Sequence, residues 1–297
     1  MKANHLTLRP QDLETRILHA YLLSAVGPRP IAFASTMDPK GNPNLSPFSF
    51  FNVFSANPPV LIFSPARRVR DNTTKHTLEN AKDTREVVIN VVTHEMVQQM
   101  SLASTEYDQG VNEFVKAGFS MVPSREVRPY RVGESPVQFE CRVTKVEPLG
   151  QEGGAGNLVF SEVVMIHIRK DILDGNDRID PLKLDLVGRM GGNWYNRASA
   201  GMFEVPKPLS SKGIGVDAIP EGIRNSTVLT GNDLGILGNV EKTPTAEEVR
   251  LFVVESDEVH AVLRSKDPVL IHEKARHYIK KGDTDTAWKL LLAASLE

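Results

Sequence analysis

The 297-residue sequence predicts a mainly β protein with short helices, followed by a helical C-terminal region. Between residues 29 and 205, short apolar segments follow one another without long helices between them. This order favours an antiparallel barrel over a doubly wound sheet. Beyond Pro206 and Pro208 the apolar residues change to helical spacing. At about 150 residues per domain the length also fits two parts, which we expect at 1–205 and 206–297.

The barrel region contains a helix, a series of strands and several short connecting helices. Leu13, Ile17 and Tyr21 keep helical spacing within residues 1–28, and the Gly-Pro-Arg-Pro run that begins at Gly27 ends that helix. Six strands are expected from their apolar and β-branched content, at 30–36, 44–54, 60–63, 87–92, 136–146 and 158–168. The first two form a hairpin around the turn at 38–42, and the last two form another. Short helices are expected near 74–82, 94–103 and 111–117.

The C-terminal region begins with a linker and continues as amphipathic helices. Ser210, Ser211 and Gly213 are typical of a linker. Asp283 and Thr284 are expected to cap the last helix. We expect the helices to pack on the barrel or on a second copy of the chain. One helix face is predicted to comprise Ile271, Ala275, Tyr278 and Ile279, and the next Ala287, Leu290, Leu291 and Ala294.

Composition excludes several classes of function. Lysine and arginine total 35 against 37 acidic residues, so the chain has no general attraction for nucleic acid or anionic lipid. No apolar run approaches the roughly 18 residues of a membrane span. Charged residues at Asp12, Glu14 and Arg16 argue against a secretory signal. The sequence therefore predicts a soluble, cytoplasmic protein that binds neither nucleic acid nor membrane.

Three motifs that suggest other chemistry do not meet its requirements. The glycine cluster at 150–156 lies between two predicted strands, whereas a dinucleotide fingerprint needs a strand before it and a helix after it. His272 and His277 are five residues apart, so they diverge by about 140° on a helix and cannot share a zinc ion. Cys141 is the only cysteine and is expected to be a small buried apolar residue. We therefore expect no metal site.

The segment 35–52 combines residue types suited to a flat polar ligand. Asn44, Ser46 and Ser49 are interleaved with phenylalanines after a predicted turn. Backbone N–H groups freed by an irregularity at Pro47 can face the polar edge of such a ligand, with aromatic rings as apolar walls. A surface hairpin with an aromatic inner side explains the same pattern, and the pattern alone does not decide between them.

Two further segments offer cationic and aromatic groups. Residues 64–77 place three arginines and a lysine before a predicted helix N-terminus, where unpaired N–H groups and arginine forks favour a phosphate. Residues 187–195 combine an arginine, two aromatic residues and glycines, which suits a loop that faces a ligand. A solvated basic loop and a tight aromatic turn are the respective alternatives. His167, in an apolar strand, is either a structural histidine or a functional one.

These segments together resemble the flavin reductase-like family, which has the FMN-binding split β-barrel fold. The resemblance covers roughly residues 20–205, and its specificity lies in the order of its motifs. The motifs are the runs at 28–36, 41–52, 58–59, 75–80, 86–90, 112–114, 135–141, 162–164, 167 and 188–189. One departure is His76, where the family usually has aspartate in a Lys-Asp-Thr motif. The helical region after about residue 210 is another.

The resemblance implies a six-stranded antiparallel Greek-key barrel that forms homodimers and binds one FMN per subunit. It implies cofactor binding by Thr36, Asn44, Leu45, Ser46, Ser49, Phe50, Phe51, Ser64, Arg67, Lys75 and Thr77. It implies that His167, Arg189 and Tyr195 approach the flavin as residues of the catalytic site, either from the same subunit or from its partner across the dimer interface. Hydride would come from NADH or NADPH, and electrons would pass to an acceptor or to a partner monooxygenase. A non-enzymatic FMN-binding electron carrier or sensor, and an enzyme that uses FMN to oxidise a small substrate, are the alternatives.

Overall fold

The computed structural model describes residues 5–205, 212–255 and 257–295. The chain divides into two compact units, Met1–Met202 and Phe203–Glu297, which are described separately. The predicted linker residues Pro206, Pro208, Ser210 and Ser211 lie outside the described residues.

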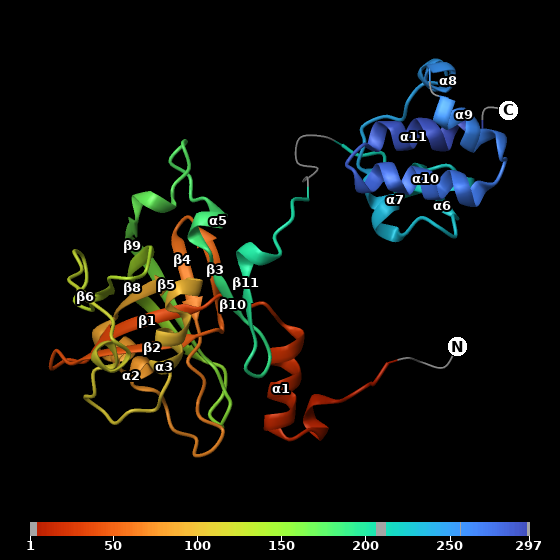
Figure 1. Cartoon of the computed structure of the whole chain (residues 1–297). Coiled ribbons are helices and arrows are strands. Elements are labelled where there is room, and N and C mark those ends of the chain that lie inside the picture. Colours follow the sequence, from red (N-terminus) through yellow and green to blue (C-terminus); the bar gives the residue numbers. More distant parts are fainter. Residues whose placement is uncertain (1–4, 206–211, 256, 296–297) are drawn as a thin grey trace. The chain divides into compact units, whose positions relative to one another are not determined.

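The first unit is built on one seven-stranded antiparallel sheet (Figure 1). Its strands are β1 (Ala32–Met37), β2 (Pro43–Phe48), β3 (Phe51–Ala56), β4 (Pro59–Phe63), β5 (Glu86–Val91), β8 (Val137–Pro148) and β9 (Asn157–Ile168). Two small sheets pair β6 (Met121–Val122) with β7 (Arg131–Val132), and β10 (Val187–Arg189) with β11 (Tyr195–Arg197). The helices are α1 (Thr15–Ala25), α2 (His76–Thr84), α3 (Val97–Leu102), α4 (Glu113–Ala117) and α5 (Pro181–Leu184).

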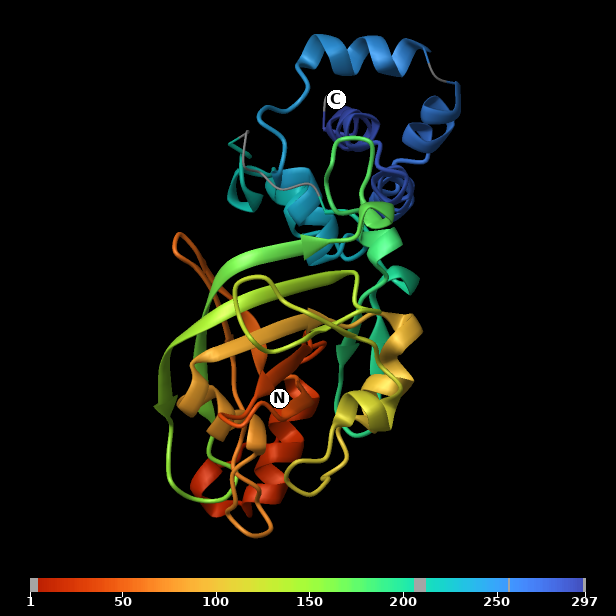
Figure 2. The ribbon, with the colours of Figure 1, turned by 90° about the vertical axis from the view of Figure 1, so that its left-hand side faces the viewer.

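The order of strands explains why the sheet closes on itself. The order is β2-β1-β5-β8-β9-β4-β3, so β2 and β3 stand at opposite ends. Only Ser49 and Phe50 connect these two strands, so the two ends of the sheet must approach each other. The long strands β8 and β9 curve accordingly (Figure 2). The result is a split β-barrel.

One sequence prediction about the strands is wrong. The single strand expected at 44–54 is two strands, because the chain bends at Ser49 and Phe50. β2 pairs with β1, whereas β3 pairs with β4. This division accounts for seven strands where six were expected. The other five expected strands are present, with ends that differ by a few residues at most.

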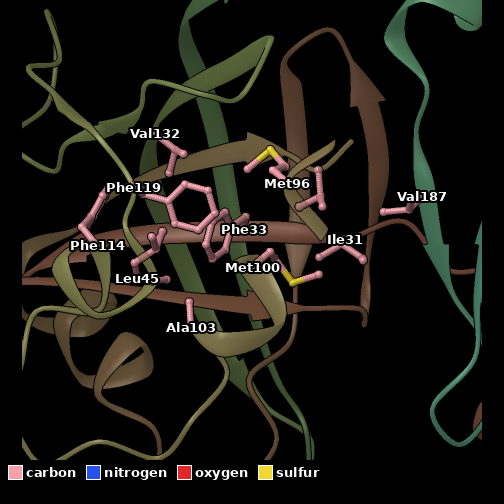
Figure 3. Packing of buried hydrophobic residues seen from close by; sticks show 12 residues of the cluster. Ile31, Phe33, Leu45, Met96, Met100, Ala103, Phe114, Phe119, Val132 and Val187 are labelled. Atoms are coloured by element: carbon pink, nitrogen blue, oxygen red, sulfur yellow. The ribbon is translucent and has the colours of Figure 1, made fainter. Parts of the chain in front are cut away.

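Strand β1 is buried on both faces and separates two apolar clusters. Ala32 and Ala34 pack with Leu78 of α2 inside the barrel. Ile31 and Phe33 face the other way, where Figure 3 shows Phe33 beside Phe119 and close to Met100 of α3. The rings of Phe33 and Phe119 meet edge to face at 5.2 Å. Because side chains alternate along a strand, this arrangement lets β1 hold α2 on one side and α3 on the other.

The second unit is helical and has its own core. Its helices are α6 (Glu221–Arg224), α7 (Gly231–Gly238), α8 (Ala246–Glu255), α9 (Asp257–Arg264), α10 (Pro268–Lys280) and α11 (Thr284–Ala293). Trp288 is buried and donates its indole N–H to the Leu237 carbonyl at 3.1 Å. Asp283 caps α11 as expected, by accepting from the Thr286 N–H. Ala294 was expected on the buried face, but it is exposed because α11 ends one residue earlier.

Candidate functional site

A buried polar network fixes β2 against two helices. The Asn44 carboxamide oxygen accepts from the Thr77 hydroxyl at 2.7 Å and lies 3.3 Å from the Thr36 hydroxyl. Asn80 donates to Thr36 at 3.1 Å. On its other side, the Asn44 amide donates to Glu113 at 2.9 Å. Thr36, Asn44 and Thr77 were predicted as cofactor ligands. Their side chains are joined by hydrogen bonds centred on Asn44, and this network holds β2 in position.

Glu113 is a site residue that the sequence reasoning did not select. Its two carboxylate oxygens accept from the Asn44 amide and from the Leu45 backbone N–H, at 2.9 and 3.0 Å. Burial raises the pKa of Glu113, although these hydrogen bonds oppose the shift. The sequence marked Glu113 only as part of the Asn-Glu-Phe motif, and that motif did not show that its carboxylate contacts β2.

A small hollow lies at the N-terminus of α2, and we call it the cationic hollow after Arg68 and Lys75. It encloses about 30 Å3 and is lined by Ser46, Arg68, Lys75 and Thr77, among others. The carboxylates of Glu106 and Glu113 line it as well, each held by hydrogen bonds to other groups. Burial, and then the charge of Arg68, lower the pKa of Lys75. The first N–H groups of α2 have no partner within the helix. Two cations beside a helix N-terminus are suited to a phosphate.

Arg68 is held in this hollow by three hydrogen bonds. Its guanidinium donates to Glu106 at 2.9 Å, to the Thr73 hydroxyl at 2.9 Å and to the Thr74 carbonyl at 2.6 Å. Glu106 is also bound by Arg70 at 3.0 Å. These contacts hold the Arg68 charge close enough to Lys75 to lower the pKa of that lysine.

Arg67 and Ser64, both predicted as cofactor ligands, hold loops instead. The Arg67 guanidinium donates to the side chain and the carbonyl of Asn72, at 2.5 and 2.6 Å. The Ser64 hydroxyl accepts from the Asn157 N–H at 3.0 Å and is buried. Neither residue lines the cationic hollow. A Cβ atom on Gly153 would lie 3.0 Å from the Arg68 carbonyl, so the glycine-rich loop packs closely on this segment.

A second hollow brings together Ser49, Arg189 and Tyr195, as predicted from separate segments. It encloses about 320 Å3, and Pro47 and Ser101 also line it. The Arg189 guanidinium lies over the Tyr195 ring, 4.6 Å from its centre, and donates to the Trp194 carbonyl at 3.2 Å. This stacking keeps the cation at the hollow without an acidic partner among the described residues.

Three hollows adjoin one another and are called the row below; residues of β2 line the first two. Ser104 lines both the cationic hollow and the second one, and Ser46 and Pro47 are consecutive. A third hollow of about 430 Å3 shares Ser101, Arg189, Asn193 and Tyr195 with the second. It is also lined by His94, Gln98 and Arg197.

The outer edge of β2 presents carbonyl groups to this row. Because β2 ends the order of strands, only one of its edges is paired. The bond from the Leu45 N–H to Glu113 shows that Leu45 turns its backbone groups outward, so Pro43 and Pro47 do so as well. Proline has no N–H. Pro43 and Pro47 therefore offer only carbonyl oxygens on this edge, while the expectation that an irregularity at Pro47 frees neighbouring N–H groups stays a prediction.

Three other predicted ligands lie away from the row. The Leu45 side chain is fully buried in the core, and Phe51 packs against the barrel interior. Phe50 is 37% exposed and meets the His19 ring of α1 edge to face at 6.1 Å. None of the three lines the hollows described above.

Arg29 joins the elements around the second hollow. It is 6% exposed, and its guanidinium donates to the carbonyls of Leu23 and Val26 at 2.6 and 2.5 Å, at the end of α1. It also donates to the Met190 carbonyl at 3.0 Å and to the Ser49 hydroxyl at 3.3 Å. Burial and the charge of Arg189 lower the pKa of Arg29.

His167 does not join this row. Strands β5 and β8 separate β9, which carries His167, from β1. The His167 ring nitrogen lies 2.6 Å from a carboxylate oxygen of Glu140, which is fully buried. Burial alone would raise the pKa of Glu140, but hydrogen bonds from the Glu126 and Arg125 N–H groups and from His167 lower that pKa by more. The geometry gives His167 a structural partner.

We expect His167→Gln to lower the free energy of unfolding by about 1–3 kcal/mol, because the buried Glu140 carboxylate would lose its short hydrogen bond to the imidazole. The rate of flavin reduction should stay within about twofold of wild type, since the substituted residue is remote from the row. Because the folded pKa of Glu140 is lowered, its contribution to stability is present above the ordinary carboxyl pKa and is lost as the pH falls through the folded pKa.

Urea titrations between pH 3 and pH 7 of wild type, His167→Gln and Glu140→Gln check this. Glu140→Gln should show the weaker loss of stability on acidification. A large fall in the rate of flavin reduction with unchanged stability would instead support the catalytic role that the resemblance implied for His167.

Two other sequence expectations concern reactive groups and the membrane. Cys141 is buried, and burial raises the pKa of its thiol far above the ordinary value, so the thiolate does not form at neutral pH. Within the described residues, no cluster of three metal-ligating side chains is found. None of the helices there is long and apolar enough to cross a membrane.

Comparison with known proteins identifies the family. The model of the family described as "Flavin reductase like domain" matches residues 25–184. An uncharacterised protein of Aquifex aeolicus is 39% identical over 181 residues, which are 61% of this chain and 90% of the relative. The match to the family model ends before β10, so Arg189 and Tyr195 lie outside it.

Two solved structures share the fold. Nitrilotriacetate monooxygenase component B from Bacillus cereus superposes with a TM-score of 0.64 at 24% identity, over 69% of this chain and 100% of that one. A protein of the flavin reductase type with a split barrel domain, from Shewanella frigidimarina, gives 0.58 at 24% identity, over 68% and 100%. The chain therefore belongs to the flavin reductase-like family, with a split β-barrel and an additional helical unit.

Proposed function

We propose that this protein binds FMN along the row of hollows and transfers hydride from NADH or NADPH to it. The observation that carries the proposal is the continuity of the row, which leads from a cationic hollow at a helix N-terminus to a cation stacked on a tyrosine ring. Membership of the flavin reductase-like family supports a flavin oxidoreductase.

The residues present fit FMN in each part of the row. Arg68, Lys75 and the first N–H groups of α2 would hold the phosphate. The outward carbonyl oxygen of Pro47, which lines the second hollow, is an acceptor for an N–H on the edge of the ring system. Bound flavin supplies hydride acceptance. Arg189, beside the ring, would favour negative charge there.

The third hollow is where we propose that the nicotinamide donor enters. It adjoins the second hollow through Arg189 and Tyr195. His94, Gln98 and Asn193 offer polar groups there, while Arg197 is bound to Asp185 at 2.7 Å. A nucleotide can thus approach the ring without a dinucleotide fingerprint, which the sequence lacks.

The reduced flavin, or its electrons, would then pass to a separate monooxygenase component. The structural relative from Bacillus cereus is component B of a monooxygenase, which supports this proposal. The described hollows are open to solvent on the barrel surface, consistent with a flavin that another protein can reach.

An anaerobic visible spectrum tests the function directly. The protein is mixed with FMN, and NADH and then NADPH are added. A perturbed flavin band that bleaches within seconds is expected, and the faster nucleotide names the donor. Arg189→Gln should slow bleaching by about tenfold or more at saturating FMN, since it removes the cation beside the ring. A perturbed band that neither nucleotide bleaches would contradict the reductase and favour an electron carrier.

We also propose that the barrel forms a homodimer through one face of its sheet. Strand β9 exposes Val164, Ile166 and Ile168 on one side, at 39%, 50% and 41%. On β3, two strands away, Val53 and Phe54 are each 64% exposed. Exposed apolar side chains on several strands of one sheet are typical of a surface that is buried in an interface.

We expect Ile166→Glu to dissociate the dimer, because a buried unpaired carboxylate at the interface is costly. Sedimentation velocity should show a dimer for wild type and a monomer for the variant. Glu162→Gln, on the same strand but at a polar position, is the control. A wild-type monomer at micromolar concentration would overturn the proposed interface.

A further inference from the structure

The largest hollow described lies in the helical unit and has no part in the flavin site. It encloses about 770 Å3 among α8, α9, α10 and the end of α11. Its apolar lining includes Val253, Leu263, Pro268, Ile271 and Ala293. This volume is within the range of about 300–1,000 Å3 that is typical of pockets for small organic molecules.

Among the residues whose side chains the structure describes, the charged groups that line this hollow are cationic. They are Arg250, Arg264 and Lys266, and none of the described lining residues is a carboxylate. Within the described part of the chain, no acidic partner is found for the guanidinium groups of Arg250 and Arg264. The two arginines come from different helices, α8 and α9, so the fold brings their charges to one opening.

The two histidines at the hollow add hydrogen-bonding groups. His260 and His272 both line it. The His272 ring nitrogen Nδ1 lies 2.7 Å from the Ser226 hydroxyl, and burial lowers the pKa of His272. His272 therefore stays neutral at neutral pH and can bond to a polar ligand.

From this arrangement we propose that the helical unit binds a small amphipathic organic anion, a carboxylate or sulfonate with an apolar body. The apolar lining would take the body, and Arg250 with Arg264 would take the acid group in forked hydrogen bonds. Long basic side chains often merely cover apolar surface with their stems. If the arginines form an anion site, binding depends on the charge of the ligand. If their stems only cover apolar surface, binding does not depend on that charge.

The experiment compares two fluorescent probes that differ in one group. Full-length protein saturated with FMN is titrated with 8-anilinonaphthalene-1-sulfonate and with N-phenyl-1-naphthylamine, which lacks the sulfonate. The sulfonate is expected to bind about tenfold more tightly than the neutral probe. Decanoate should displace it, and decanol should do so less well.

Variants assign the binding to this hollow. Arg250→Gln combined with Arg264→Gln should raise the Kd for the sulfonate probe by about tenfold. The Kd for the neutral probe should stay within about twofold of its wild-type value. The double variant Lys280→Gln, Lys281→Gln removes the same amount of charge outside the hollow, and it should leave the Kd for both probes unchanged. Ala294→Trp, at an exposed position on its rim, should reduce binding of both probes. Equal affinity for the two probes, or equal effects of both double variants, would overturn the proposal.

Discussion

Replacing Arg68 and Lys75 together with glutamine is expected to raise the Kd for FMN by about a hundredfold or more, because two charge-assisted contacts to the phosphate are lost. Both cations line the hollow at the N-terminus of α2. Fluorescence quenching of FMN on titration with protein measures the affinity. Riboflavin, which has the ring system without the phosphate, should lose affinity by less than about threefold.

The neighbouring arginine provides a matched control. Arg67→Gln removes the same charge one residue away, but its guanidinium is bound to Asn72 and does not line the hollow. Its effect on the Kd for FMN should be within about threefold, the size expected of a screened charge outside the site. Arg67→Gln could instead weaken FMN binding as much as the double variant does, or riboflavin could lose as much affinity as FMN. Either result would show that the phosphate binds elsewhere.

Replacing Arg29 with methionine is expected to lower the free energy of unfolding by about 3 kcal/mol, since several buried acceptors lose a charged donor. Leu23, Val26 and Met190 each accept from this guanidinium through their carbonyls. Equilibrium unfolding in urea measures the change. Proteolysis within residues 190–194 should also become faster, because the contact that holds this turn against α1 is lost.

Two further variants separate the hydrogen bonds from the charge. Arg29→Lys keeps the charge but not the fork, so it should recover only part of the lost stability. Arg16→Met, at an exposed position on α1, should change the free energy of unfolding by less than about 0.5 kcal/mol. An Arg29→Met protein as stable as Arg16→Met would show that the observed contacts contribute little.

Local patterns in the sequence predicted most of the elements. The strand predicted at 60–63 differs from β4 by one residue at its start, and the strand predicted at 87–92 differs from β5 by one residue at each end. Both runs are rich in β-branched residues, which favour strands. The strand at 44–54 was wrong because Phe51 to Phe54 have strand propensity of their own. Nothing local shows that their partner is β4 rather than β1.

The sequence predicted which segments contribute to the candidate site more accurately than it predicted which of their side chains line it. The three segments at 35–52, 64–77 and 187–195 do supply residues to one row of hollows. Arg67 and Arg68 are adjacent and chemically identical, so the sequence offered no basis for choosing. The choice depends on the loop at 150–156, to which the Arg67 backbone is bound at both its N–H and its carbonyl.

Residues close together in the chain were enough to predict all but one of the six strands, the change to helices after residue 205 and the order of motifs that marks the family. Which side chains face the row depends instead on tertiary contacts. Glu113 meets Asn44 across 69 positions, and Arg29 meets Met190 across 161. Such contacts depend on how the barrel closes, and local periodicity carries no information about which distant residues are brought together.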